Sequence, residues 1–315
     1  NGMSDNLINL LSSYLANRKQ RVVLNGSVSD FITTKSGVPQ GSVLGPLLFL
    51  VYINDLEINI KSKIKFFADD TMLYSIIRNP SISATELNHD LDIISIWAHQ
   101  WKMSFNPDLT KQAVEIVFSR KYDKPIHPPL FFNGIEVFKV EEHKHLGLLL
   151  DSKLTFHNHI LTKIQKAKKN IGILTKLASY VPLSTLDQLY KIFIRSHLDY
   201  CDVIYHIPPS KSDFDSTIRL HISMELIEKV QYQAALAITG TWQGSNRNKL
   251  YEELGWESLS DRRWSRRLCH FYKITHNIAP TYLSDSIPRH RRPLYGNANS
   301  ETFYEIYCRS SQYLN

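Results

Sequence analysis

The feature of this sequence that most constrains its fold is a change of hydrophobic pattern near residue 155. Before that point, short runs typical of β-strands are separated by turn residues and interleaved with helical segments. After it, apolar residues recur every three or four positions over long stretches, which is the spacing of one face of an α-helix. The pattern predicts an α+β first half followed by a helical second half.

Tight turns divide the first half into predicted hairpins. Asn25-Gly26 and Asn133-Gly134 each separate two strand-like runs, and this dipeptide favours the turn in which both central residues have positive φ. Asp69-Asp70 separates two further runs in the same way. Helices are predicted at 4–17, 44–57, 84–101, 160–177, 184–199, 225–239 and 257–275, with strands at 64–68, 71–76, 113–118 and 145–151. The predicted buried face of the helix 84–101 runs from Leu87 to Trp101.

Composition limits the class of protein. A chain of 315 residues with 43% hydrophobic residues can bury a core and suggests two domains. The net charge of +7 permits a polyanionic partner without requiring one. Cys201, Cys269 and Cys308 lie far apart and form no CxxC pair, which argues against a disulfide framework and a four-thiolate zinc site.

Nothing in the sequence predicts a membrane span or a secretion signal. The longest apolar run, 43–53, is interrupted by Gly45 and Pro46 and is shorter than the roughly 20 residues that a span needs. The first residues lack the basic and apolar regions of a signal peptide. The chain does not begin with Met, so we expect a piece of a longer polypeptide, and the cysteine usage predicts a reducing intracellular location.

Asp69 and Asp70 are the sharpest chemical feature. Two adjacent carboxylates at the end of a hairpin can hold hard divalent cations, because Mg²⁺ prefers oxygen ligands and keeps substrate phosphates in its shell. Two such ions about 4 Å apart can activate a 3′-hydroxyl and stabilise leaving pyrophosphate. Flanking residues 66–68, 72 and 73 are expected to bury the sides of the turn. The alternative is a solvated turn, since Asp is a favoured turn residue.

The second feature is the segment SGVPQGSVLGPLLF, residues 36–49. Its glycines allow the backbone to approach a ligand closely, and the start of a helix that follows favours phosphate. Gln40 offers both a hydrogen-bond donor and an acceptor to a base or a sugar. The alternative is a Gly/Pro loop before a buried helix.

Together with FADDT at 67–71, this segment resembles motifs B and C of reverse transcriptases, specifically those of non-LTR (LINE-like, jockey-type) retrotransposons. WAHQWKMSFNPDLTK at 97–111 resembles motif D of that family, and HKHLGLLLD at 143–151 resembles motif E, the primer grip. The later segments around YCDVIY, KLYEELGWESL and RRWSRRLCHFYKI are similar to the thumb and C-terminal region of such elements. The resemblance covers nearly the whole chain.

The resemblance implies catalytic roles. Asp69 and Asp70 would be two of three carboxylates that bind two catalytic Mg²⁺ ions, with Mn²⁺ as an alternative ion and Asp70 as the less essential of the pair. Lys111 matches the lysine of motif D, which would protonate or stabilise the leaving pyrophosphate. A surface lysine is the alternative for Lys111.

The resemblance also implies positioning roles. Phe67 and Ala68 would lie near the primer end or the incoming nucleotide. Three consecutive residues would position the template and the nascent base pair: Pro39, Gln40 and Gly41. Leu146 and Gly147 would form the primer grip, and an ordinary turn between strands is the alternative for both.

One departure from the family pattern concerns the third carboxylate. In the family this residue belongs to motif A, upstream of the region where this chain starts, and the fingers lie upstream too. Asp5 is expected to cap a helix, and Asp30 lies between hairpin strands. With two carboxylates of three, we expect the isolated chain to be catalytically weak or inactive.

Residues 152–186 contain six lysines and no acidic residue. Most of these lysines lie away from the apolar stripe of the predicted helix 160–177, as contacts to a nucleic-acid backbone would require. The lysines assigned to the backbone are Lys163, Lys166, Lys168, Lys169 and Lys176. The alternative is a solvated helix face. Two arginine clusters, at 262–267 around Trp264 and at 289–292, extend the basic surface.

These features lead to one interpretation. Residues 1–150 are expected to be a partial right-hand polymerase palm of mixed helices and antiparallel hairpins, residues 155–280 a helical thumb or connection, and residues 281–315 an incomplete C-terminal segment. The full-length parent would be an RNA-directed DNA polymerase that uses an RNA template, a DNA primer and deoxynucleotide triphosphates. It would act in the cytoplasm and nucleus as a ribonucleoprotein. The alternatives are a transposon relic that binds nucleic acid without chemistry, and a fragment with neither activity.

Overall fold

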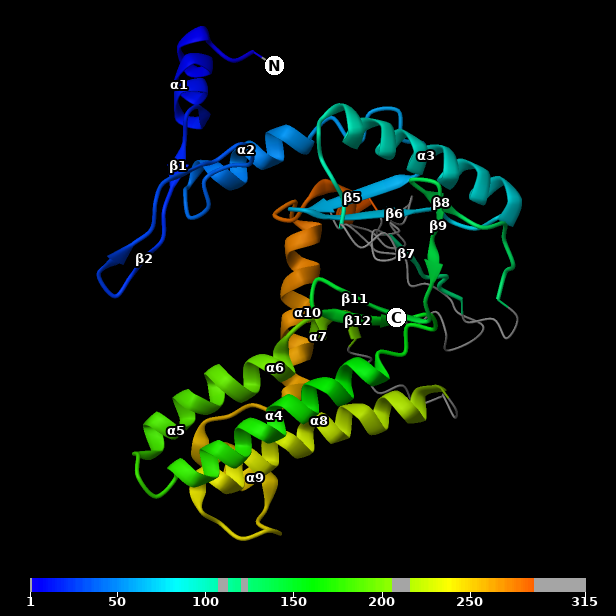
Figure 1. The fold of residues 1–315 in the computed structure, drawn as a ribbon. Coiled ribbons are helices and arrows are strands. Elements are labelled where there is room, and N and C mark those ends of the chain that lie inside the picture. Colours follow the sequence, from blue (N-terminus) through cyan, green and yellow to red (C-terminus); the bar gives the residue numbers. More distant parts are fainter. Residues whose placement is uncertain (1, 107–112, 120–123, 206–215, 286–315) are drawn as a thin grey trace. The chain divides into compact units, whose positions relative to one another are not determined.

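The computed structural model describes residues 2–106, 113–119, 124–205 and 216–285, without the side chains of 216–223. The chain divides into two compact units (Figure 1). Unit 1 comprises residues 1–115 and 121–140, and unit 2 comprises residues 116–120 and 141–315.

Unit 1 combines three helices with short paired strands. The helices are α1 (Asp5–Leu15), α2 (Leu44–Ile53) and α3 (Pro80–Gln100). The strands are β1 (Lys19–Gln20), β2 (Val23–Leu24), β3 (Ser27–Val28), β4 (Ile32–Thr33), β5 (Lys63–Phe67), β6 (Asp70–Tyr74), β7 (Val114–Glu115), β8 (Phe131–Phe132), β9 (Ile135–Glu136) and β10 (Phe138–Lys139). Three helices were expected here and are confirmed, although α2 ends earlier and α3 begins earlier than predicted.

Local turn chemistry explains the hairpins. Asn25 and Gly26 have φ of 48° and 82°, and Asn133 and Gly134 have φ of 52° and 75°. These are the paired positive φ values that the Asn-Gly dipeptide favours, so both predicted hairpins are confirmed as β2–β3 and β8–β9. Each sheet among the described residues has two strands, and β7 pairs with β10 in parallel, which the sequence did not predict.

Helix α3 supplies much of the core of unit 1. Asn79 caps its start by accepting hydrogen bonds from the backbone of Ser81 and Ile82, and Pro80 follows at the first helical position. Trp97 is buried and donates from Nε1 to Asp55 Oδ1 at 2.9 Å. The expectation that Trp101 lies on the buried face is wrong, because Trp101 is 42% exposed.

Unit 2 is mostly helical. It contains the hairpin strands β11 (Glu142–His145) and β12 (Leu148–Asp151). Its helices are α4 (His157–Leu177), α5 (Leu183–Tyr190), a π-helical turn (Lys191–Arg195), α6 (Ser196–Asp199), α7 (Asp202–Tyr205), α8 (Ser216–Thr239), α9 (Arg247–Leu254), α10 (Leu259–Thr275) and α11 (Thr281–Asp285). The four predicted long helical segments are confirmed, and α9 is a further helix that was not among the predicted ranges.

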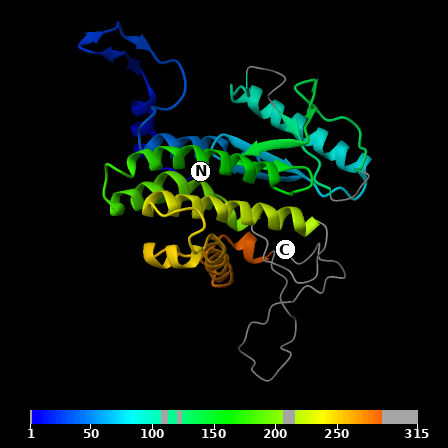
Figure 2. The ribbon, with the colours of Figure 1, turned by 90° about the horizontal axis from the view of Figure 1, so that it is seen from below.

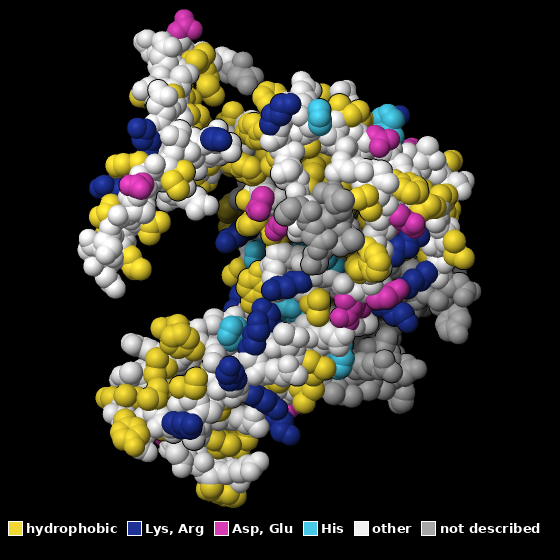
Figure 3. Space-filling model, in the orientation of Figure 1, with side chains coloured by type: hydrophobic (Ala, Val, Ile, Leu, Met, Phe, Trp, Pro, Cys, Tyr) yellow, Lys and Arg dark blue, Asp and Glu magenta, His cyan; other side chains and the backbone are white. Residues whose placement is uncertain are grey.

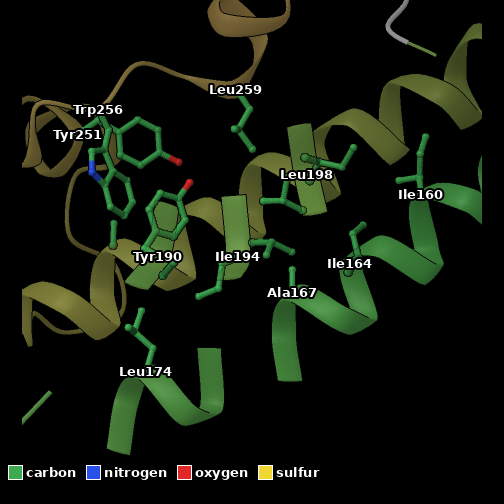
Figure 4. Close-up of a cluster of buried hydrophobic side chains, with 14 of the residues drawn as sticks. Ile160, Ile164, Ala167, Leu174, Tyr190, Ile194, Leu198, Tyr251, Trp256 and Leu259 are labelled. Carbon is green, nitrogen blue, oxygen red and sulfur yellow. The ribbon is translucent and has the colours of Figure 1, made fainter. Parts of the chain in front are cut away.

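The core of unit 2 forms where α4 and α8 lie side by side (Figures 1 and 2). The buried stripe of α4 is the predicted one, with Ile160, Ile164, Ala167 and Leu174 pointing into the cluster drawn in Figure 4. At one end of this cluster, the rings of Tyr190 and Trp256 stack with centroids 3.9 Å apart. The described residues therefore mix helices with small sheets, as an α+β fold requires.

Among the described helices, none is both long enough and apolar enough to cross a bilayer.

Candidate active site

The Asp69-Asp70 pair lies on the hairpin formed by β5 and β6, as predicted. Phe67 pairs with Asp70 across the strands, so the connecting turn contains two residues, Ala68 and Asp69. Ala68 has φ of 51°, a left-handed conformation that is unfavourable for a residue with a side chain. Asp69 therefore lies in the turn itself and Asp70 is the first residue of β6.

The hairpin has one half-buried and one exposed face. Ile64, Phe66 and Leu73 pack against the core of unit 1. Phe67 lies on the opposite face together with its cross-strand partner Asp70. The Phe67 side chain is 64% exposed. Burial of the sides of the turn is thus confirmed for Phe66 and Leu73 but wrong for Phe67, Ala68 and Met72, which are exposed. The carboxylates are accessible to a ligand.

A buried aspartate that the sequence analysis missed holds the start of this hairpin. Asp90 of α3 is fully buried and accepts hydrogen bonds from the backbone N–H groups of Lys61 at 3.0 Å and Ser62 at 2.7 Å. Burial raises the pKa of Asp90, but these hydrogen bonds prevail and lower it below its ordinary value. Asp90 therefore remains ionised and ties α3 to the two residues that lead into β5.

The donor set of the hairpin fits part of a divalent-metal site. Asp69 and Asp70 offer hard oxygen ligands, and their exposure leaves room for water or phosphate in the rest of a coordination shell. Within the described part of the chain, no group of three His, Cys, Asp or Glu side chains is placed to hold a metal ion. The pair therefore needs further ligands from a substrate or from residues outside the described ranges.

The loop before α2 is closed by a serine. Ser42 Oγ donates to the carbonyl of Pro39 at 2.9 Å and accepts from the N–H of Gly45 at 3.0 Å. Gly37 and Gly41, with φ of 81° and 75°, supply the left-handed backbone on either side of Pro39. Gln40 is exposed beside them, so its amide is accessible to a ligand.

Gly45 allows this loop to pack on the first turn of α2. A methyl group at residue 45 would lie 2.9 Å from the carbonyl oxygen of Pro39, which is backbone and cannot rotate away. We expect Gly45→Ala to lower the free energy of unfolding by about 1–3 kcal/mol, the usual effect of overpacking. Chemical denaturation measures this. The control is Gly172→Ala on α4, where a methyl group meets nothing within 4 Å and helix propensity favours alanine. Equal stability of the two variants would contradict the packing argument.

The predicted primer-grip residues form a second tight turn. Leu146 and Gly147 connect β11 to β12 with φ of 46° and 81°. The carbonyl of Leu146 accepts a hydrogen bond from the hydroxyl of Tyr200. Leu149 of β12 donates from its N–H to His159 Nδ1 of α4 at 3.2 Å. The hairpin is thereby fixed to the helices of unit 2.

His159 makes the stability of this attachment dependent on pH. The side chain is 2% exposed, and burial, assisted by Lys163, lowers the pKa of His159 from 6.5 to about 4. The folded chain therefore binds fewer protons than the unfolded chain between these values. The contribution of neutral His159 to the free energy of unfolding is complete above pH 6.5. It is lost as the pH falls to about 4, and the loss is about 3 kcal/mol. Denaturation as a function of pH measures it. In His159→Gln, the free energy of unfolding should fall less steeply between pH 6.5 and 4. The same pH dependence in the variant and the wild type would show that His159 is not the group responsible.

The lysines of α4 are mostly exposed. Lys166, Lys168, Lys169 and Lys176 lie on the solvent side of the helix, whereas Lys163 is half-buried. Figure 3 shows Lys and Arg side chains along the part of unit 2 that contains α4 and α6. This arrangement agrees with the predicted separation of an apolar stripe from a basic face.

The arginine cluster 262–267 of α10 is not the free basic surface that was expected. Arg262 and Arg266 donate to Asp199 at 3.1 and 2.9 Å, and Arg266 also pairs with Asp202. Arg263 is 2% exposed. The sequence shows the charges of α10 but not their acidic partners more than sixty positions away. Lys111 and the cluster 289–292 lie outside the described residues.

Residues 4–166, about half of the chain, match the reverse transcriptase (RNA-dependent DNA polymerase) family. This chain belongs to that family. The matched segment contains the loop before α2, the β5–β6 hairpin and the Leu146-Gly147 turn. The reverse transcriptase resemblance inferred from the motifs is therefore confirmed.

Relatives with curated names agree. The chain is 30% identical over 240 residues to the probable RNA-directed DNA polymerase from transposon X-element of Drosophila melanogaster, covering 73% of this chain and 25% of that protein. It is 31% identical over 166 residues to the RNA-directed DNA polymerase from mobile element jockey of the same organism, covering 50% of this chain and 18% of that protein. It is 28% identical over 193 residues to the probable RNA-directed DNA polymerase from transposon BS of Drosophila melanogaster, covering 59% of this chain and 21% of that protein.

These relatives support a jockey-type non-LTR reverse transcriptase. The chain spans about a quarter or less of the length of each of them. No solved structure gives a significant match.

Proposed function

We propose that the full-length polypeptide containing this chain synthesises DNA on an RNA template. The observation that carries the proposal is the β5–β6 hairpin, which presents Asp69 in an exposed turn and Asp70 beside it at the exposed start of β6, inside the segment that matches the reverse transcriptase family. The relatives' names, each an RNA-directed DNA polymerase of a mobile element, support the same activity.

The two carboxylates would hold divalent metal ions, Mg²⁺ or alternatively Mn²⁺, together with ligands from the substrate. Such ions supply charge stabilisation at the attacking and leaving oxygens of an in-line phosphoryl displacement. The residues of this chain provide the fixed negative charge and its position. Asp90 supports that position, because it holds the start of β5 through two backbone hydrogen bonds.

The neighbouring segments would position the nucleic acid. Gln40 would contact the template and the nascent base pair, since its exposed amide stands on a loop fixed by Ser42. Phe67 and Ala68 would lie near the primer end, and the Leu146-Gly147 turn would grip the primer. Lys111 would assist the leaving pyrophosphate. In this interpretation residues 1–150 belong to a palm and residues 155–280 to a thumb or connection.

The substrates follow from the activity. They would be an RNA template, a DNA primer and deoxynucleotide triphosphates, and the parent element would act in the cytoplasm and nucleus as a ribonucleoprotein. The direct test is primer extension by the full-length polypeptide with and without Asp69→Ala, Asp70→Ala. Extension of an RNA-templated primer by the double variant would refute the proposed site.

A second candidate function is nucleic-acid binding without chemistry. The exposed lysines Lys166, Lys168, Lys169 and Lys176 of α4 favour it. A protein that neutralises phosphates loses affinity steeply as salt rises, because bound counterions are released. A steep salt dependence in a polypeptide that extends no primer would support this function instead. Absence of salt-dependent binding would show that the lysine face is only solvated.

A further inference from the structure

Tyr200 joins the Leu146-Gly147 turn to the helices of unit 2. It directly follows α6, and its hydroxyl donates a hydrogen bond to the carbonyl of Leu146, 54 positions earlier in the chain. Leu146 lies in the two-residue turn that follows the last paired residues of the hairpin, His145 and Leu148. The hydroxyl therefore restrains the turn at its tip.

The turn is shaped to receive this ring. A methyl group at residue 147 would lie 3.0 Å from the Tyr200 hydroxyl oxygen and 3.3 Å from two ring carbons. Gly147 also has φ of 81°, which other residues rarely adopt. Glycine is thus required here both for the conformation of the turn and for the close approach of Tyr200.

The Tyr200 ring also contacts a cation. Lys163 Nζ of α4 lies over the Tyr200 ring, 4.4 Å from its centroid, which is the geometry of a cation–π interaction. Burial lowers the pKa of Lys163, and the charges of Lys166 and Lys144 lower it further, while Cys201 acts in the opposite direction. Lys144 and Lys166 thus lie near enough to Lys163 for their charges to act on it, and an anionic partner would relieve this repulsion.

Tyr200 is itself held by the residues on either side of it. Asp199 and Asp202 are both paired with Arg266 of α10, and Asp199 is also paired with Arg262. The segment 199–202 is consequently attached to α10 by ion pairs that do not involve the turn.

We propose that Tyr200 is a positioning residue that fixes the Leu146-Gly147 turn and holds the ammonium group of Lys163 beside it, so that both meet the backbone phosphates of a bound nucleic acid. The inference rests on the proposed function, because it assigns the nucleic acid as partner. It adds Tyr200, a residue outside the segment that matches the family.

The test compares two substitutions in the full-length polypeptide. Tyr200→Phe removes the hydrogen bond and keeps the ring under Lys163, whereas Tyr200→Leu removes both. Hydrogen exchange at the amides of Gly147 and Leu148 reports on the turn. Binding of an RNA–DNA primer duplex at several salt concentrations reports on Lys163. Tyr180→Phe is the matched control, since Tyr180 is 84% exposed in the same unit.

We expect both Tyr200 variants to exchange the turn amides roughly threefold to tenfold faster, the equivalent of one net hydrogen bond. Tyr200→Leu should also bind the duplex about tenfold more weakly, with a salt slope smaller by about one phosphate contact. Tyr180→Phe should change neither, and exchange at the buried amides of α4 should stay constant in all variants, which shows that the fold is intact.

Unchanged exchange at the turn in both variants would overturn the inference. Unchanged affinity and salt slope in Tyr200→Leu, in a polypeptide that binds the duplex, would also overturn it. If the wild-type polypeptide extends no primer but the exchange and binding changes appear as expected, the proposed polymerase function fails and the positioning role of Tyr200 is supported.

Discussion

Replacing Arg266 with methionine is expected to lower the free energy of unfolding by about 3 kcal/mol or more, the cost of leaving a buried charge without its partner. Arg266 pairs with Asp199 at 2.9 Å and with Asp202, whose side chain is 2% exposed. Burial and the charge of Asp199 raise the pKa of Asp202, and Arg266 opposes this. Chemical denaturation of the wild type and the variant measures the difference.

Two controls separate this effect from the loss of any surface arginine. Arg247→Met breaks an ion pair with Glu225 in which both side chains are exposed, so it should change the free energy of unfolding by less than about 1 kcal/mol. Adding Asp202→Asn to Arg266→Met removes the unpaired charge and should restore part of the stability. Equal stability losses in Arg266→Met and Arg247→Met would contradict the role of the buried cluster.

The effect of Arg266→Met should also depend on pH. Without Arg266, the pKa of the buried Asp202 carboxyl rises further above its unfolded value. The folded variant then binds a proton more readily than the unfolded chain, so its stability deficit should shrink as the pH is lowered. A deficit that stays constant down to acidic pH would show that lost packing, not the unpaired charge, is responsible.

Replacing Asp69 with asparagine in the full-length polypeptide is expected to reduce primer extension about a thousandfold. The change keeps the size of the side chain in the turn and removes the negative charge that would hold a divalent cation. Charge stabilisation of several kcal/mol is then lost, and each 1.36 kcal/mol corresponds to about a tenfold change in rate. Single-turnover extension of a labelled primer measures it. Asp70→Asn should have a smaller effect.

The matched control for Asp69→Asn is Asp92→Asn, a change of one exposed carboxylate on α3 of the same unit. It alters net charge equally and lies away from the hairpin in sequence, so extension should remain within about twofold of the wild type. Equal losses in both variants would show that the charge of unit 1, not the position of Asp69, matters.

The sequence predicted those features that depend on neighbouring residues. The Asn25-Gly26 and Asn133-Gly134 hairpins follow from the φ values that these residues tolerate, and the buried stripe of α4 follows from helical spacing. The β5–β6 hairpin was also predicted from local pattern, but its turn is Ala68-Asp69, one residue earlier than the predicted Asp69-Asp70 turn. Each of these patterns involves only residues that are close together in the sequence.

Features that depend on distant residues could not be predicted. In the sequence Asp90 is simply a polar residue in a helix. Its role depends on two backbone partners that lie 28 and 29 positions earlier in the chain. The charges of Arg262 and Arg266 indicate a basic surface in the sequence, but in the folded chain both residues pair with Asp199. Helical spacing permitted Trp101 on the buried face, and packing placed Trp97 there instead.

The most direct test of RNA-templated DNA synthesis is the addition of one nucleotide to a DNA primer annealed to RNA. The full-length polypeptide is supplied with each of the four deoxynucleotide triphosphates separately and with Mg²⁺. We predict that only the nucleotide complementary to the next RNA base is added, and that the chosen nucleotide changes when that base is changed. Addition of nucleotides regardless of the template base, or no addition by the wild type, would contradict RNA-templated DNA synthesis by this polypeptide.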